Sequence, residues 1–177
     1  ELETFAFISK TTTQEFQGYA VGAQTMGIEM ETLAAQFKDF NEKLGEFVTL
    51  GSGGAVDFFE KIAIKTEGSA EGARKLALEM QNLSGPKALQ LYVDKMEEAG
   101  VTQQQMSFYL ESMASDTTNL IPLLKDGGKG FEYWADAAER AGVIIDESGI
   151  QKAAELKVQI KLLELQVEGA KNQFIPG

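Results

Sequence analysis

The sequence has 177 residues, of which 44% are hydrophobic, and it contains no cysteine and no histidine. Its formal net charge of −11 argues against nucleic acid or an anionic membrane as the main partner, because both attract basic surfaces. The missing cysteines exclude disulfides and thiolate metal sites, and the missing histidines remove the commonest general base and metal ligand. The length suffices for one domain with a hydrophobic core.

The chain shows no sign of membrane insertion or secretion. No apolar run approaches the ~20 residues that a membrane-spanning helix needs, so we expect no transmembrane segment. No signal peptide is visible. The chain begins at Glu1 rather than at a methionine, and we interpret it as a piece of a longer protein.

Residues 1–50 are predicted to form N-terminal helices. Thr12 and Glu15 have the spacing of a capping box, which begins a helix that Gly27 ends. A longer helix is predicted over 29–50, because its apolar residues recur at helical spacing. These residues are Leu33, Phe37, Phe40, Leu44 and Phe47.

The middle of the chain, residues 55–142, is predicted to form a helical core after a flexible Gly-rich linker at 51–54. Its centre is an αα-hairpin expected over 85–115. We place Gly85 at the N-cap of the first hairpin helix and Pro86 at its first helical position, where the missing N–H costs nothing.

The second hairpin helix begins directly after Gly100, where Thr102 and Gln105 form another capping box. Beyond the hairpin, the glycines of 126–130 predict a turn before the next helix. That helix ends at Gly142, and the run Val143, Ile144 and Ile145 is β-prone.

The last helix is predicted over 146–174, with Asp146 or Ser148 as its cap. A heptad seam runs along it and suggests self-association. The seam residues are Leu156, Ile160, Leu163 and Val167, with β-branched residues at a and leucines at d. This choice favours a parallel two-stranded coiled coil. However, Val158, Leu162 and Leu165 are apolar off the seam, which favours burial in a bundle or a higher oligomer.

No group of residues predicts catalysis. Gly51, Gly53 and Gly54 lack the following Lys-Ser/Thr of a phosphate-binding loop. Ser84 and Lys87 match S-x-x-K, but the companion motifs of penicillin-recognising enzymes are missing. We therefore expect no enzyme, with no catalytic residues, no cofactor and no metal site.

Several blocks of the chain together follow a recognisable linear pattern. The first block is 38–47 with 57–62, and the second is 83–92 with Gly100 and 103–111. The third is Ser115, Asp116, Leu120, Pro122, Leu123, Leu124 and Gly127, and the last is 138–142 with 171–174. With these blocks, almost the whole chain resembles the tail tape measure proteins of long-tailed bacteriophages and prophages.

The resemblance implies a mostly helical structural protein that runs inside the tail tube. Its length sets tail length, tube subunits assemble around it, and it leaves the tail ahead of the DNA. The implied partners are copies of itself, the tail tube protein, tail assembly chaperones and tail-tip proteins, without sequence-specific binding of nucleic acid. The implied location is the lumen of the virion tail, and the cytoplasm of the bacterial host during assembly.

One feature conflicts with a fully extended ruler: glycines interrupt the helices repeatedly. We therefore expect a compact helical domain from which the last helix leads into an elongated part. The alternative function is a soluble helical adaptor or scaffold that binds a partner helix in an apolar groove. An exposed groove of methionine and phenylalanine side chains would support that alternative.

Overall fold

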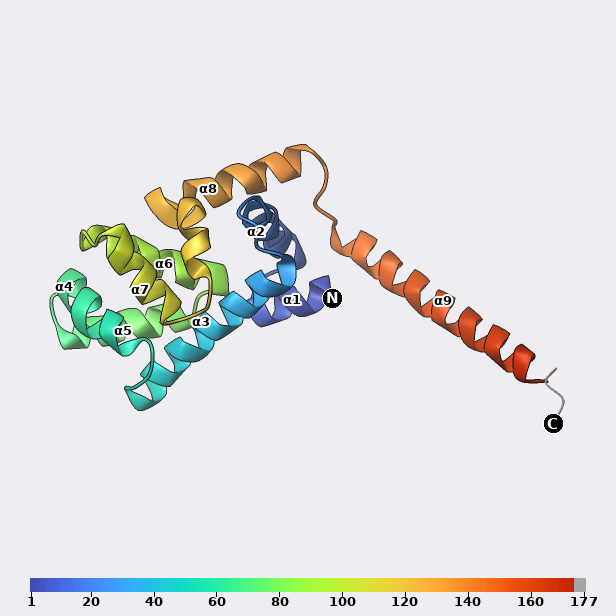
Figure 1. Cartoon of the computed structure of the whole chain (residues 1–177), viewed down its shortest axis with the longest axis horizontal. Helices are drawn as coiled ribbons and strands as arrows, with labels where there is room; N and C mark the ends of the chain where they lie inside the picture. The colour runs from blue at the N-terminus through green and yellow to red at the C-terminus, as the bar shows by residue number, and fades with distance from the viewer. Residues whose placement is uncertain (174–177) are drawn as a thin grey trace. The chain divides into compact units, whose positions relative to one another are not determined.

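A computed structural model describes residues 1–173, and all regular structure in that range is helical, which confirms the expected all-α class (Figure 1). The expected end of the last helix at Phe174 lies outside the described residues. In chain order the elements are α1 Leu2–Ser9, α2 Thr13–Thr25, α3 Met30–Leu50, the π-helix η1 Phe58–Ala63, α4 Ile64–Glu67, α5 Ala70–Gln81, α6 Gly85–Glu98, α7 Gln103–Glu111, the 3₁₀ turn η2 Thr117–Leu120, α8 Ile121–Arg140 and α9 Glu147–Gln173.

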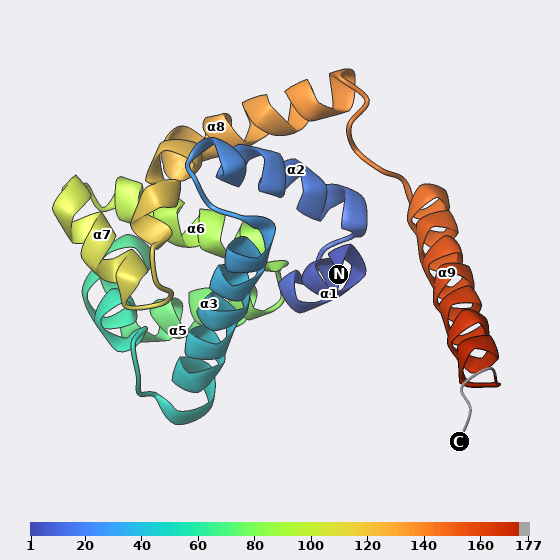
Figure 2. The same cartoon turned by 45° about the vertical axis from the view of Figure 1, so that its right-hand side comes forward.

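The chain divides into two units, residues 1–144 and the part from Ile145 onward. Within the first unit, helices distant in sequence pack together: α2 lies along α8, and α3 contacts α1, α5 and α6 (Figure 2). The segments expected at 1–50 and 55–142 therefore share one multi-helix bundle. The second unit is α9 with the residues around it.

The core of the bundle is rich in aromatic side chains, with Tyr92 of α6 fully buried among them. Phe58 stacks on the Tyr92 ring with centroids 4.0 Å apart, and Phe40 meets it edge-on at 5.1 Å. The Tyr92 hydroxyl donates a hydrogen bond of 2.6 Å to the carbonyl of Tyr109. This bond gives the buried hydroxyl a partner and links α6 to α7, the two helices of the expected hairpin.

The helix N-termini follow their local sequence signals. Both expected capping boxes form, at Thr12 with Glu15 and at Thr102 with Gln105. The N-cap of α6 differs from the prediction: it is Ser84, whose hydroxyl accepts the N–H of Lys87 at 3.3 Å. A serine side chain can accept this bond, whereas Gly85 has no side chain to do so.

The Gly-rich segment 51–54 is a loop of the bundle between α3 and η1. Gly51 and Gly53 have positive φ angles of 69° and 96°, which glycine adopts without steric cost. A Cβ added at Gly54 would clash with the backbone carbonyl oxygen of Ser112, at the end of α7. The loop therefore allows a close approach of two backbones.

The expected turn near 126–130 interrupts α8, whose residues 125–128 are non-helical. Asp126, Gly127 and Gly128 all have positive φ. The backbone N–H of Asp126 donates to the Glu97 carboxylate at 2.9 Å, which attaches the turn to α6. Gly142 ends α8 with a φ of 71°, and the β-prone run after it forms a connector with no strand among the described residues.

A carboxylate holds the turn between α7 and η2. Glu111 accepts the backbone N–H groups of Asp116 and Thr118, each at 2.8 Å, and the Thr118 hydroxyl at 2.7 Å. Burial raises the pKa of Glu111, but these hydrogen bonds outweigh burial and hold the pKa below its ordinary value of 4.5. The ionised carboxylate therefore stabilises a turn in which Asp116 has a positive φ.

Glu111→Gln is expected to lower the free energy of unfolding at pH 7 by about 1 kcal/mol, because this partly exposed site loses charge-assisted bonds. The pKa of Glu111 is lower in the folded chain than in the unfolded chain. Its contribution is thus fully present above pH 4.5 and is lost as the pH falls through the lower, folded pKa. Urea unfolding at pH 7 and pH 3 should show a smaller difference between the two proteins at pH 3 than at pH 7. An equal difference at both pH values would contradict this role.

Candidate self-association surface

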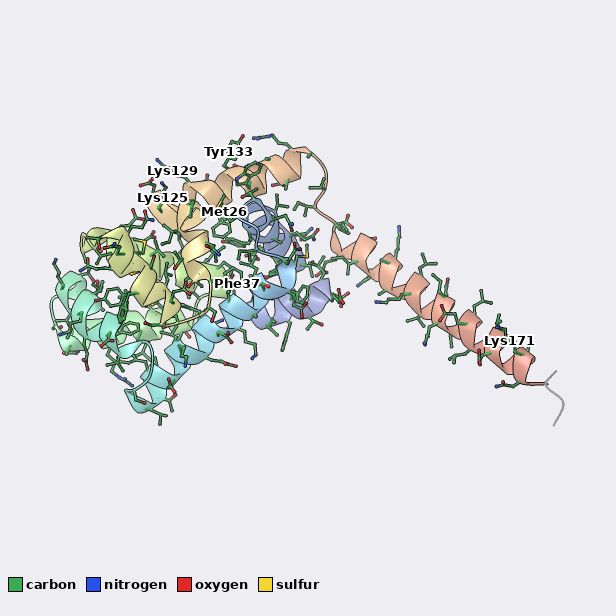
Figure 3. All side chains as sticks on the ribbon, viewed as in Figure 1. Met26, Phe37, Lys125, Lys129, Tyr133 and Lys171 are labelled. Atoms are coloured by element: carbon green, nitrogen blue, oxygen red, sulfur yellow. The ribbon has the colours of Figure 1, made fainter. Side chains whose placement is uncertain are left out.

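The N-terminus of α9 carries a side-chain cap, as the sequence predicts. Of the two candidates, Asp146 provides it: its carboxylate accepts the N–H of Gly149 at 2.8 Å. The helix has 27 residues, which correspond to a rise of ~40 Å. Every residue from Gln151 to Asn172 is exposed in the single chain, and side chains project from the helix along its length, with Lys171 near its end (Figure 3).

All four predicted seam residues lie on one side of α9, since they alternate spacings of four and three. Leu156, Ile160, Leu163 and Val167 are between 49% and 60% exposed. Ala153 and Ala170 extend the same line at its two ends. We call these six residues the α9 seam.

A second apolar stripe lies on the side of α9 opposite the seam. It contains Val158, Leu162 and Leu165, which are also more than half exposed. The two flanks between the stripes differ. One is charged throughout and carries Lys157, Lys161, Glu164, Glu168 and Lys171, and the other carries Gln159 and Gln166 together with Lys152 and Glu155. The helix therefore presents two separate apolar faces to its surroundings.

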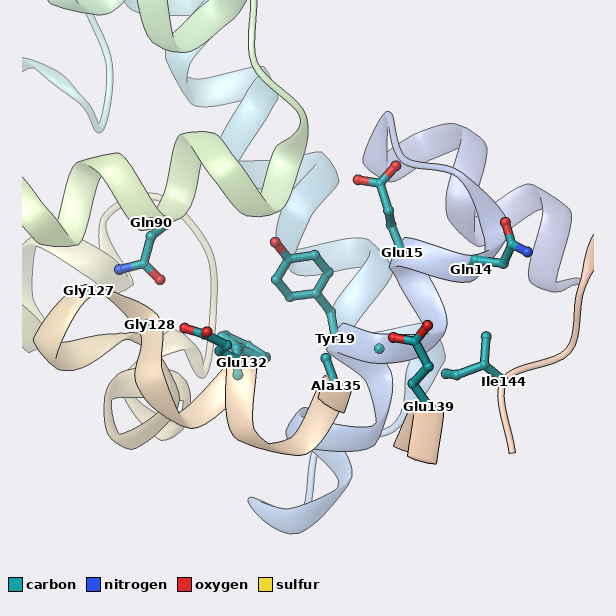
Figure 4. Close-up of a pocket in the computed structure, with 12 residues that line it drawn as sticks. Gln14, Glu15, Tyr19, Gln90, Gly127, Gly128, Glu132, Ala135, Glu139 and Ile144 are labelled. Atoms are coloured by element: carbon teal, nitrogen blue, oxygen red, sulfur yellow. The ribbon is translucent and has the colours of Figure 1, made fainter. Parts of the chain in front are cut away.

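The first unit contains a different candidate site, a groove of about 780 Å³ between α2 and α8. Tyr19 and Phe131 lie at its aromatic part, where their rings meet edge-on at 5.2 Å. Gln90 of α6 lies at one end, and its side-chain amide donates to the carbonyl of Leu124 at 2.8 Å. Figure 4 shows Tyr19 and Gln90 at the groove, with Ile144 near the end opposite Gln90.

The polar lining of the groove is dominated by carboxylates. Glu15 comes from α2, and Glu132 and Glu139 come from α8 (Figure 4). Burial and the neighbouring charge of Glu15 raise the pKa of Tyr19, so its hydroxyl stays neutral and able to donate. The lining contains phenylalanine but no methionine, and it differs in this respect from the apolar groove that the adaptor alternative requires.

Sequence reasoning did not find this groove. Its residues come from α2, α6, α8 and the connector after α8, and no local motif unites them. Among the described residues, no cluster of Asp, Glu, His or Cys side chains is arranged to hold a metal ion. Across residues 1–173, no helix combines the length and the apolar character needed to cross a bilayer.

The fold and these surfaces define the chain as an all-helical protein in which a helical bundle precedes a long helix with two exposed apolar faces. Comparisons with protein-family models, with curated proteins and with solved structures found no match. The α9 seam, which the sequence predicts as a self-association surface, is exposed in the structure.

Proposed function

We propose that the chain is a structural segment of a phage tail tape measure protein, which acts through its length and its helix contacts. The observation that carries the proposal is α9, a 27-residue helix with apolar side chains exposed on two opposite faces. Burying either face against other helices is favourable at ~25 cal/mol per Å² of apolar surface. A helix of this kind therefore favours an assembled state.

The division of the chain supports a distinct role for each unit. Residues 1–144 have a continuous hydrophobic core of their own, so this bundle folds back on itself and adds little length per residue. The helix α9 adds ~1.5 Å for every residue. We propose that α9 belongs to the extended, length-determining part of the protein and that the bundle is a folded module within it.

The proposed partners follow from the same role. Copies of the chain pack together through α9, and the tail tube protein assembles around them in the tail lumen. Tail assembly chaperones bind the protein in the bacterial cytoplasm before assembly, and tail-tip proteins contact it at the end of the tail. The resemblance of residues 38–47 and 83–92 to tape measure proteins supports this assignment.

Deleting residues 151–172 in frame is expected to shorten the tail of the phage that encodes the chain. The deletion removes 22 helical positions, which correspond to ~33 Å of tail length. Electron microscopy of intact virions measures this length. A duplication of the same segment is the matched control and should lengthen the tail by the same amount. Tails of unchanged length in both variants would refute the ruler role of α9.

The alternative function remains a helical adaptor that binds a partner helix. The groove between α2 and α8 is where such a helix would lie, beside Tyr19 and Phe131. Its carboxylates Glu15, Glu132 and Glu139 would select a basic rather than a purely apolar partner. We place this function second, because the exposed apolar surface of α9 has no role in it.

A further inference from the structure

The groove between α2 and α8 carries only negative charge among the described residues that line it. Its charged side chains are Glu15, Glu132 and Glu139. Glu132 and Glu139 lie on one face of α8, seven positions apart, which corresponds to ~10.5 Å along the helix. Within residues 1–173 neither carboxylate forms a hydrogen bond or an ion pair. The groove therefore offers two separated anionic groups that are not neutralised.

The floor of the groove between these two carboxylates is apolar and narrow. Ala135 lies between Glu132 and Glu139 on α8, and a Cβ added to Gly18 of α2 would be only 3.1 Å from the Cβ of Ala135. The two helices therefore almost touch at this point. A slim, unbranched chain can lie along such a floor more closely than an α-helix, whose side chains give it a diameter of ~10–12 Å.

An aromatic pair and two further oxygen atoms complete the groove. The rings of Tyr19 and Phe131 meet edge-on at 5.2 Å. The hydroxyl of Tyr19 forms no hydrogen bond among the described residues. The side-chain nitrogen of Gln90 donates two hydrogen bonds within the chain, so its amide oxygen remains an acceptor. In Figure 4, the Tyr19 ring lies between Gln90 on one side and Glu15 and Glu139 on the other.

These features define the chemistry of a ligand that would fit. Separated carboxylates and free acceptor oxygens require cationic N–H groups that are some distance apart. The apolar floor and the aromatic rings favour methylene groups, and a ring face also attracts an ammonium ion. The cavity of about 780 Å³ has the size of a small-molecule site. A linear aliphatic polyamine combines all of these properties.

We propose that the groove binds a linear polyamine of the spermidine type, with ammonium groups at Glu132 and Glu139 and methylene groups along Tyr19 and Ala135. A single metal ion does not fit the same site, because no cluster of carboxylates among the described residues is arranged to hold one. The inference concerns residues 1–144 and does not depend on the tape measure role of α9, so either can fail without the other.

Isothermal titration of the whole chain with spermidine tests the proposal. The double variant Glu132→Gln, Glu139→Gln is expected to raise the Kd by at least tenfold, because it removes both charged partners and keeps the size of the side chains. The matched control is Glu60→Gln with Glu79→Gln, which also removes two exposed carboxylates but none that lines the groove. Its Kd should stay within about twofold of the natural value, since distant surface charges are largely screened.

Tyr19→Phe tests the aromatic part of the site separately from the carboxylates. The substitution keeps the ring and removes only the hydroxyl, so the Kd for spermidine should rise by about two- to tenfold, as expected for one lost hydrogen bond. Circular dichroism of each variant verifies that the bundle is retained. A Kd that is unchanged in Tyr19→Phe and in the groove double variant would overturn the proposed site.

Three other outcomes would also overturn the proposal. Equal losses in the groove double variant and in its control would mean that spermidine is only attracted to the net charge of −11. Displacement of spermidine by MgCl₂ more effectively than by NaCl of the same ionic strength would indicate a site for divalent cations. A Lys-rich helical peptide that binds at the groove when spermidine does not would instead support the adaptor function.

Discussion

Replacing Phe58 with alanine is expected to lower the free energy of unfolding by about 3–5 kcal/mol, because it removes a fully buried aromatic ring and leaves a cavity. Phe58 stacks on Tyr92 at 4.0 Å and meets Phe59 edge-on at 4.9 Å. Loss of the ring thus removes contacts at the centre of the bundle. Urea unfolding followed by circular dichroism and by tyrosine fluorescence measures the change.

The matched control for this prediction is Phe108→Ala on α7. Phe108 is 52% exposed and contacts the ring of Tyr109 at 5.3 Å. Since about half of this residue is already exposed to water, the same substitution there should cost less than about 1 kcal/mol. Equal losses at the two positions would mean that the aromatic cluster around Tyr92 does not dominate the stability of the bundle.

The features that sequence predicts well here are those encoded by neighbouring residues. A capping box needs only Thr12 and Glu15, three positions apart, and both of its hydrogen bonds form. The buried stripe of α3 needs only helical spacing, and its residues Leu33, Phe37 and Phe40 are fully buried. Such signals do not depend on which distant segment covers the helix.

The features that sequence reasoning missed depend on contacts between distant segments. The segment with Phe58 and Phe59 reads as an ordinary helix, yet it forms a π-helix in which both rings are buried. Phe58 stacks on Tyr92 of α6 and Phe59 stacks on Phe47 of α3. The π-helix is therefore packed against two other helices. The groove between α2 and α8 could not be predicted either, because its lining residues come from segments that are distant in the sequence.

The α9 seam lies between these two cases. Periodicity predicts its residues, and the structure places them along one exposed side of the helix. How the seam packs is a property of more than one chain, so the parallel coiled coil and the bundle or higher oligomer both stay predictions from the sequence. The tape measure function also stays a prediction from the sequence.

Replacing Gly54 with alanine is expected to lower the free energy of unfolding by about 1–3 kcal/mol, because the new methyl group would clash with a backbone atom. That atom is the carbonyl oxygen of Ser112, which cannot move aside as the end of a flexible side chain can. Relief of the clash requires the 51–54 loop to move away from the end of α7. If residues 51–54 were instead the flexible linker that their glycines suggest, the substitution would have no such effect.

Gly45→Ala is the matched control for Gly54→Ala and should change stability in the opposite direction. Gly45 lies inside α3, and the nearest atom to an added Cβ is the side-chain nitrogen of Gln81, at an uncrowded 3.9 Å. Alanine is favoured over glycine in a helix interior by about 0.8–1 kcal/mol, so the variant should gain up to that amount. Urea unfolding of both variants gives the two signs directly. A loss of stability at both positions would show that α3, rather than the contact at Ser112, controls the response of this region.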